Sequence, residues 1–162
     1  NVGKTTFAIN IIRHLSESKD VIGIKVSPHI HDLNEGLEII CKTQNYIVAE
    51  EKGQNNKDSS LLLQAGAKRV YFIMAKQEDL EQAFSVIAGK LKDHIVVVES
   101  GGLSELITPG VFFFVLKPDE QITKKHYLKY KPIMVVNGDL GFDFNPESLI
   151  YSNRRISLSS SE

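Results

Sequence analysis

The chain has 162 residues, of which 42% are hydrophobic, and this is enough apolar material for the core of one compact domain. Its formal net charge of -1 at pH 7 provides no basic surface for DNA or RNA, so we expect no nucleic-acid partner. The single cysteine, Cys41, excludes an intramolecular disulfide and favours a reducing compartment. The longest apolar run, GVFFFVL, has only the length of a strand. We therefore expect no membrane partner and a cytoplasmic protein.

The first residues match the second half of a phosphate-binding loop. The full pattern is Gly, four residues, Gly, Lys and then Ser or Thr, and Gly3, Lys4 and Thr5 supply its end. The first Gly of the pattern would lie before Asn1, so we expect that Gly, and the strand that feeds the loop, to be missing from this sequence. The alternative interpretation is an ordinary cap of a surface helix.

A helix is predicted directly after this loop, because Phe7, Ile11 and Leu15 recur at intervals of four residues and form one apolar stripe. Later elements follow from apolar runs, which indicate strands, and from helical spacing with polar ends. In chain order they are strands at 21–26 and 46–50, a helix at 57–67 ended by Gly66, a strand at 69–75, a helix at 77–93, strands at 94–100 and 111–117, a helical segment at 119–130 and a strand at 132–138.

Strands that are apolar on both faces and alternate with helices indicate a parallel sheet covered on two sides. The expected fold class is therefore α/β, a three-layer P-loop NTPase fold with a mainly parallel sheet, whose N-terminal strand is missing from this sequence. We expect a single nucleotide-binding domain over 1–152. The end of the chain is rich in serine, so we expect a flexible tail over 153–162.

A phosphate loop binds its anion through backbone N–H groups and the N-terminus of the helix that follows. In such a loop the amine of Lys4 reaches the β- and γ-phosphates, and the hydroxyl of Thr5 binds Mg²⁺. Lys4 is therefore also a candidate catalytic residue. Nucleotide binding is predicted for Asn1, Val2, Gly3, Lys4, Thr5 and Thr6.

Glu99 is the second predicted metal ligand, beside Thr5. It follows the apolar residues of a strand and precedes a glycine turn, where a carboxylate can support the water shell of Mg²⁺. A solvated strand end is the alternative interpretation of Glu99. The run Glu50, Glu51 and Lys52 is interpreted simply as a solvated strand end.

In this order, the loop and the segments IKVSPHIH, NKDSSLLLQAGAKRVYFI and VVVESGGL resemble the MobB-like family of P-loop GTP-binding proteins. These proteins are adaptors linked to the synthesis of molybdopterin guanine dinucleotide. The matching features fall on Lys25 with His29 and His31, on the KDS and AGA segments, and on Glu99. The chain departs from the family in the residues between Lys25 and His29 and in the turn SGGL that follows Glu99.

The resemblance implies a GTP-binding protein with slow hydrolysis that forms a homodimer and assists a partner enzyme. It also implies that Lys57 and Asp58 contact the nucleotide, with a helix cap as the alternative. Asn137 and Asp139 follow a strand and are candidates for reading the guanine base, with an Asn-Gly turn as the alternative. The expected cofactors are Mg²⁺ and GTP, or ATP.

Hydrolysis requires a group that positions water, and Asp32 is the candidate catalytic residue because it follows the strand at 21–26. The alternative function is an ATP-dependent small-molecule kinase or ligase on the same loop. A third alternative is an interaction domain whose nucleotide site has decayed. A kinase usually needs an arginine-bearing lid, and no lid-like insertion holds the arginines, which are Arg13, Arg69, Arg154 and Arg155.

Overall fold

The computed structural model describes residues 2–33 and 35–159. The chain divides into two compact units. The first, called here the sheet unit, consists of Ala8–Thr108. The second, called the C-terminal unit, consists of Pro109–Glu162 together with Asn1–Phe7.

Helix α1 (Lys4–Ser16) begins directly after Gly3, as the sequence predicts. Its apolar stripe is buried, with Ile12 fully enclosed and Leu15 nearly so. No acidic residue lies in the first turn of this helix. The positive end of the helix dipole is therefore not neutralised by a carboxylate of its own first turn.

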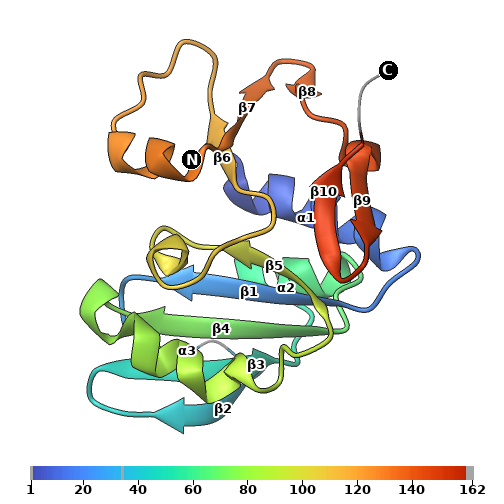
Figure 1. Ribbon diagram of the computed structural model, residues 1–162. Helices are drawn as coiled ribbons and strands as arrows, with labels where there is room; N and C mark the ends of the chain where they lie inside the picture. Colours follow the sequence, from blue (N-terminus) through green and yellow to red (C-terminus); the bar gives the residue numbers. More distant parts are fainter. Residues whose placement is uncertain (1, 34, 160–162) are drawn as a thin grey trace. The chain divides into compact units, whose positions relative to one another are not determined.

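The sheet unit is built on one five-stranded sheet with the strand order β2-β3-β4-β1-β5 (Figure 1). Strand β1 pairs in parallel with β4 on one side and with β5 on the other. Strand β3 pairs antiparallel with β4, and β2 pairs antiparallel with β3. The strands are β1 (Val21–Ser27), β2 (Leu37–Lys42), β3 (Tyr46–Glu51), β4 (Arg69–Ala75) and β5 (Ile95–Glu99).

The predicted fold class is wrong in its sheet. A three-layer P-loop fold requires a mainly parallel sheet, whereas this sheet is mixed, and the strands after β5 form two further small sheets. A short turn at 43–45 joins β2 to β3 and cannot hold the crossover that parallel strands need. The hydroxyl of Thr43 fixes this turn by accepting hydrogen bonds from the backbone N–H groups of Asn45 (3.1 Å) and Tyr46 (3.0 Å).

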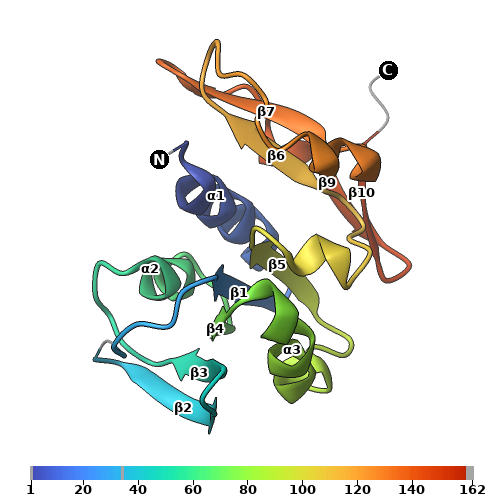
Figure 2. The same ribbon diagram turned by 90° about the vertical axis from the view of Figure 1, so that its left-hand side faces the viewer.

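Two short helices cover opposite faces of the mixed sheet (Figure 2). Helix α3 (Leu80–Ala88) joins one apolar cluster with Ile22 and Ile24 of β1. Helix α2 (Asp58–Gln64) lies against β1 and β4, with Leu62 fully buried. A Cβ added at the intervening Gly23 would meet Leu62, so α2 lies on the face opposite α3.

The predicted elements of the sheet unit differ from the structure mainly at their ends. The strand predicted at 69–75 coincides with β4, and the strand at 21–26 is β1 with one more residue. The helix predicted at 77–93 is shorter, because α3 follows a 3-10 turn at Gln77–Asp79 and stops at Gly89. Strand β2 has no counterpart in the prediction.

The C-terminal unit contains two small sheets, with strand orders β6-β7-β8 and β10-β9. Strands β6 and β7 are parallel, and β7 and β8 form an antiparallel hairpin. The ring centroid of Phe7 lies 5.1 Å from those of Phe113 and Phe142, so aromatic packing holds the start of α1 in this unit. The elements are β6 (Phe113–Leu116), the 3-10 helix η3 (Lys125–Tyr130), β7 (Ile133–Gly138), β8 (Gly141–Phe142), the 3-10 helix η4 (Pro146–Ser148), β9 (Leu149–Ser152) and β10 (Arg155–Leu158).

The helix predicted at 119–130 is replaced by the shorter 3-10 helix η3, in which only Tyr127 is buried. Without an apolar face to bury, a longer helix gains no stabilisation from packing. The predicted tail at 153–162 contains β10, which pairs with β9. The turn between these strands holds Asn153 and Arg154 at φ values of 50° and 62°, as a tight hairpin requires.

Gly66 ends α2 as predicted and provides a test of this local geometry. Its φ is +112°, and an added Cβ would lie 2.5 Å from the Oγ of Ser16. We expect Gly66→Ala to lower the free energy of unfolding by about 1–2 kcal/mol, because alanine is strained at positive φ. Gly89→Ala is the control, since its φ is -65° and an added Cβ meets nothing within 4 Å. Urea unfolding should show no loss for that control, and equal losses would contradict the account.

Candidate functional site

The loop before α1 turns sharply at Gly3, whose φ is +87°. The carbonyl of Gly3 accepts the first hydrogen bond of the helix from the backbone N–H of Phe7 over 2.9 Å. The helix therefore begins at once, and its first turn presents backbone N–H groups that have no acceptor within the helix. Lys4 and Thr6 are exposed there, and Thr5 is half-buried. Asn1, also predicted to bind nucleotide, lies outside the described residues.

The loop is held by the hairpin of the same unit. The Nδ2 of Asn137, on β7, donates a hydrogen bond to the carbonyl oxygen of Val2 over 3.2 Å. Asp139 lies exposed in the turn between β7 and β8. The structure thus brings Asn137 to the predicted loop, and it makes Asn137 a contact of the loop backbone.

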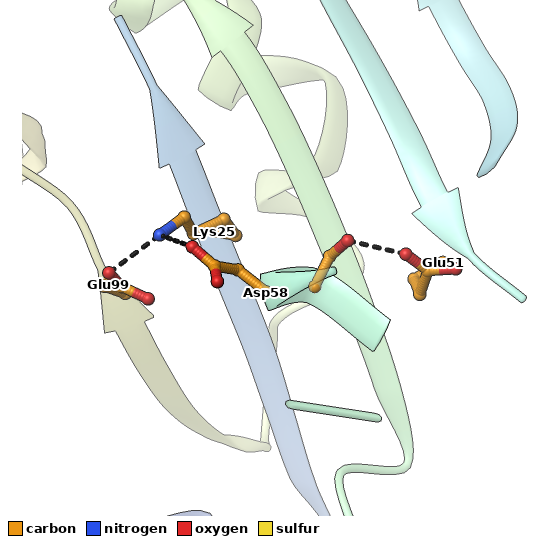
Figure 3. A network of polar contacts seen from close by, with 5 residues as sticks. Lys25, Glu51, Asp58 and Glu99 are labelled. Atoms are coloured by element: carbon orange, nitrogen blue, oxygen red, sulfur yellow. Dashed lines mark hydrogen bonds and ion pairs between the residues drawn. The ribbon is translucent and has the colours of Figure 1, made fainter. Parts of the chain in front are cut away.

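A second group of predicted residues meets at the carboxyl end of the sheet. The register of β1 and β5 places Lys25 beside Glu99, and the Nζ of Lys25 lies 2.7 Å from the Oε1 of Glu99. The same Nζ lies 2.7 Å from the Oδ2 of Asp58, at the start of α2 (Figure 3). We call Lys25, Asp58 and Glu99 the ion-pair cluster.

The members of the ion-pair cluster differ strongly in exposure. The side chains of Glu99 and Lys25 are 8% and 16% exposed, whereas that of Asp58 is 51% exposed. Burying a carboxylate is costly unless a cation accompanies it, and Lys25 provides that cation for Glu99. Asp58 is the partner that solvent reaches, so an anionic ligand approaching Lys25 would compete with Asp58.

Glu51, at the end of β3, makes hydrogen bonds to the segment that leads into α2. It is only 2% exposed, so the interpretation of this residue as part of a solvated strand end is wrong. Its carboxylate accepts hydrogen bonds from the Oγ of Ser59 (2.5 Å) and from the backbone N–H of Gly53 (2.8 Å). These bonds tie the end of β3 to the first turn of α2, next to Asp58 (Figure 3).

The other predicted residues of the sheet unit lie in exposed loops. Asp32 follows β1, and its carbonyl oxygen is 3.1 Å from the Nδ1 of the neighbouring His31. Lys57 is the N-cap residue of α2 and makes no side-chain cap bond. The helix-cap alternative therefore does not describe this helix start, where the Asp58 carboxylate pairs with Lys25 instead.

The sequence also contains a signal for the pairing of Lys25 with Glu99, which no motif predicts. Lys25 follows four buried residues of β1, and Glu99 ends a neighbouring apolar strand. A lysine and a glutamate that follow the buried runs of two neighbouring parallel strands are expected to neutralise each other. Glu51 carries no comparable signal, because its partners Gly53 and Ser59 lie in a loop and in the first turn of α2.

Comparison of the chain with protein-family models, with curated proteins and with solved structures found no match. Among the residues that the structure describes, no helix combines the length and the apolar character needed to cross a membrane. In that same part of the chain, no group of three or more His, Cys, Asp and Glu side chains is arranged to hold a metal ion. Function is therefore inferred from local geometry.

The unequal burial of the ion-pair cluster predicts unequal energetic coupling. In double-mutant cycles with Lys25→Met, we expect a coupling of about 1–3 kcal/mol with Glu99→Gln. With Asp58→Asn we expect less than about 1 kcal/mol, because solvent screens that pair. The exposed pair of Lys68 and Asp20 provides the control, with a coupling near zero. Urea unfolding measures all three, and a stronger coupling to Asp58 than to Glu99 would refute the assignment.

Proposed function

We propose that this protein binds a nucleotide, GTP, as its Mg²⁺ complex and hydrolyses it slowly. The observation that carries this proposal is the turn at Gly3, whose φ of +87° leads directly into a helix that begins at Lys4. Backbone N–H groups at a helix N-terminus, together with an adjacent lysine, form the usual binding site for phosphate. We rest the proposal on this local geometry and not on the architecture of the sheet.

Two further observations favour an anionic ligand at this position. The first turn of α1 carries no acidic residue that would compete with a phosphate. Lys4 is exposed, and it would supply the positive charge that stabilises the β- and γ-phosphates. The alternative, an ordinary cap of a surface helix, accounts for the same helix start but gives Lys4 no role in binding.

Of the two predicted magnesium ligands, Thr5 suits the ion better than Glu99. Mg²⁺ usually keeps several waters and takes one or two protein oxygens besides the phosphates. The hydroxyl of Thr5, in the first turn of α1, suits that role. Glu99 is already paired with Lys25, which leaves its carboxylate less charge to offer a metal. We therefore rest the metal part of the proposal on Thr5.

The choice of GTP and the adaptor role rest on the resemblance to the MobB-like family. On that basis we propose that the protein forms a homodimer and assists a partner enzyme in the synthesis of molybdopterin guanine dinucleotide. The part of the chain that carries the resemblance includes Lys25, Asp58 and Glu99. We also propose, on the same resemblance, that Lys57 and Asp58 contact the nucleotide.

Calorimetric titration with GTP and with ATP, each with Mg²⁺, tests the proposed nucleotide site. We expect Lys4→Ala to weaken nucleotide binding at least about tenfold, because a charge-assisted contact to phosphate is lost. Lys90→Ala, at another exposed lysine, is the matched control and should leave the affinity unchanged. GTP-selective binding that is lost in Lys4→Ala supports the proposal. A preference for ATP would favour the kinase or ligase alternative, and no binding of either nucleotide would contradict the proposal.

The hydrolytic step has its own test at Asp32, which is exposed after β1. We expect Asp32→Asn to slow single-turnover release of phosphate about tenfold or more, since the amide cannot accept a proton from water. The dissociation constant for the nucleotide should stay the same. Asp119→Asn, at another exposed aspartate, provides the control. A variant at position 32 with the parental rate would remove Asp32 from the mechanism.

A further inference from the structure

Asn137 joins the end of β7 to the loop at the start of the chain. Its Nδ2 donates to the carbonyl oxygen of Val2 over 3.2 Å, across 135 positions of sequence. Both residues belong to the C-terminal unit. The sequence suggests that Asn137 reads a nucleotide base, but this contact directs its amide toward the loop backbone instead.

The approach of Asn137 to the loop is close enough to restrict the residue at position 3. A Cβ added at Gly3 would lie 2.5 Å from the Nδ2 of Asn137 and 3.3 Å from the Cζ of Phe142. The φ of Gly3 is also positive, which side chains disfavour. Glycine at position 3 therefore allows both the positive φ of the turn and the close approach of the hairpin to the loop.

The hairpin that carries Asn137 is held in place by its own bonds. Asn137 lies opposite Phe142 in the register of β7 and β8. Next to it, the backbone N–H of Val136 donates to the Oδ1 of Asp143 over 2.7 Å. The N–H of Asp143 in turn donates to the carbonyl of Val136 over 3.1 Å. These backbone bonds fix the position of β7 at Asn137, and the side chain of Asn137 therefore reaches the loop from a fixed strand.

The hydrogen bond from Asn137 to the carbonyl of Val2 also fixes the orientation of the peptide group between Val2 and Gly3. The chain contains no cis peptide bond among its described residues. In a trans peptide the C=O and the N–H lie in one plane and point in opposite directions. A donor that pins the carbonyl of Val2 toward Asn137 therefore turns the N–H of Gly3 to the side away from Asn137. If the peptide rotated, the carbonyl would face the bound anion and repel it.

We propose that Asn137 is a positioning residue that orients the Val2–Gly3 peptide for phosphate binding and does not read the base. This inference deepens the proposed function and rests on it for the identity of the ligand. It makes one distinctive prediction. Loss of the Asn137 donor weakens GTP and ATP equally, because the loop contacts the phosphates that both nucleotides share.

The decisive variant is Asn137→Asp, which keeps the shape of the side chain and replaces the Nδ2 donor by an acceptor. Asn145→Asp is the matched control, since Asn145 lies in the same unit and its side chain bonds to Glu147. Asn137→Ser is a second variant that retains a hydroxyl donor. Hydrogen exchange of the amides at 2–7 is measured in the free proteins, and Mg²⁺-GTP and Mg²⁺-ATP affinities are measured by calorimetry.

Within 2–7, the amide of Phe7 donates to the loop carbonyl of Gly3. We expect Asn137→Asp to speed exchange at this amide about tenfold and to weaken both nucleotides about tenfold, with their ratio unchanged. Exchange in β1, β4 and β5 should stay the same, Asn137→Ser should be intermediate, and Asn145→Asp should match the parent. A selective loss of GTP would instead make Asn137 a base-reading residue and overturn the inference. Unchanged exchange at 2–7 would also overturn it.

The exchange measurement separates this inference from the proposed function. If the parent protein binds neither nucleotide, the proposed function fails, yet faster exchange at 2–7 in Asn137→Asp still supports the positioning of the loop by Asn137. If Asn137→Asp does not fold, Asn137→Ala, which has no side-chain donor, provides the same comparison. Equal exchange in Asn137→Ala and the parent, with equal nucleotide affinities, would then contradict the inference.

Discussion

The parallel register of β1 with β5 is the constraint on which the sheet unit depends. It places the ammonium of Lys25 against the buried carboxylate of Glu99, whose burial would be costly without that cation. Asp58 completes the arrangement from α2, and Glu51 anchors the loop that leads to it. The carboxyl end of the sheet is thus an organised polar region on an apolar base, where ligands of α/β proteins commonly bind.

The C-terminal unit holds the bent loop that precedes α1. Gly3 allows the bend, Asn137 fixes the carbonyl that precedes it, and Phe7 packs its ring among the aromatic side chains of the same unit. Residues far apart in the sequence therefore determine one local conformation. On the proposed function, the affinity for nucleotide would depend on the folding of that hairpin.

Local elements were predictable from the sequence, whereas the pairing of strands was not. The apolar spacing of α1 and the buried run of β4 predict those elements because burial on one face or on both leaves a periodic pattern. Strand direction leaves no such pattern, so the antiparallel β2 and β3 contradict the predicted sheet. In the candidate site, Lys4 and Gly3 were found by motif. Glu51 was not, because its burial depends on a hydrogen bond from Ser59 of α2, which only the tertiary structure brings to it.

Residue-resolved NMR of the amide groups during titration with Mg²⁺-GTP tests the central claim most directly, because it locates the ligand as well as detecting it. The account predicts saturable shifts concentrated on the amides of 2–6, with a smaller effect at Asn137, and the same pattern at 2–6 with inorganic phosphate at higher concentration. Shifts that leave 2–6 unchanged and appear elsewhere, or no shifts at saturating nucleotide, would contradict it.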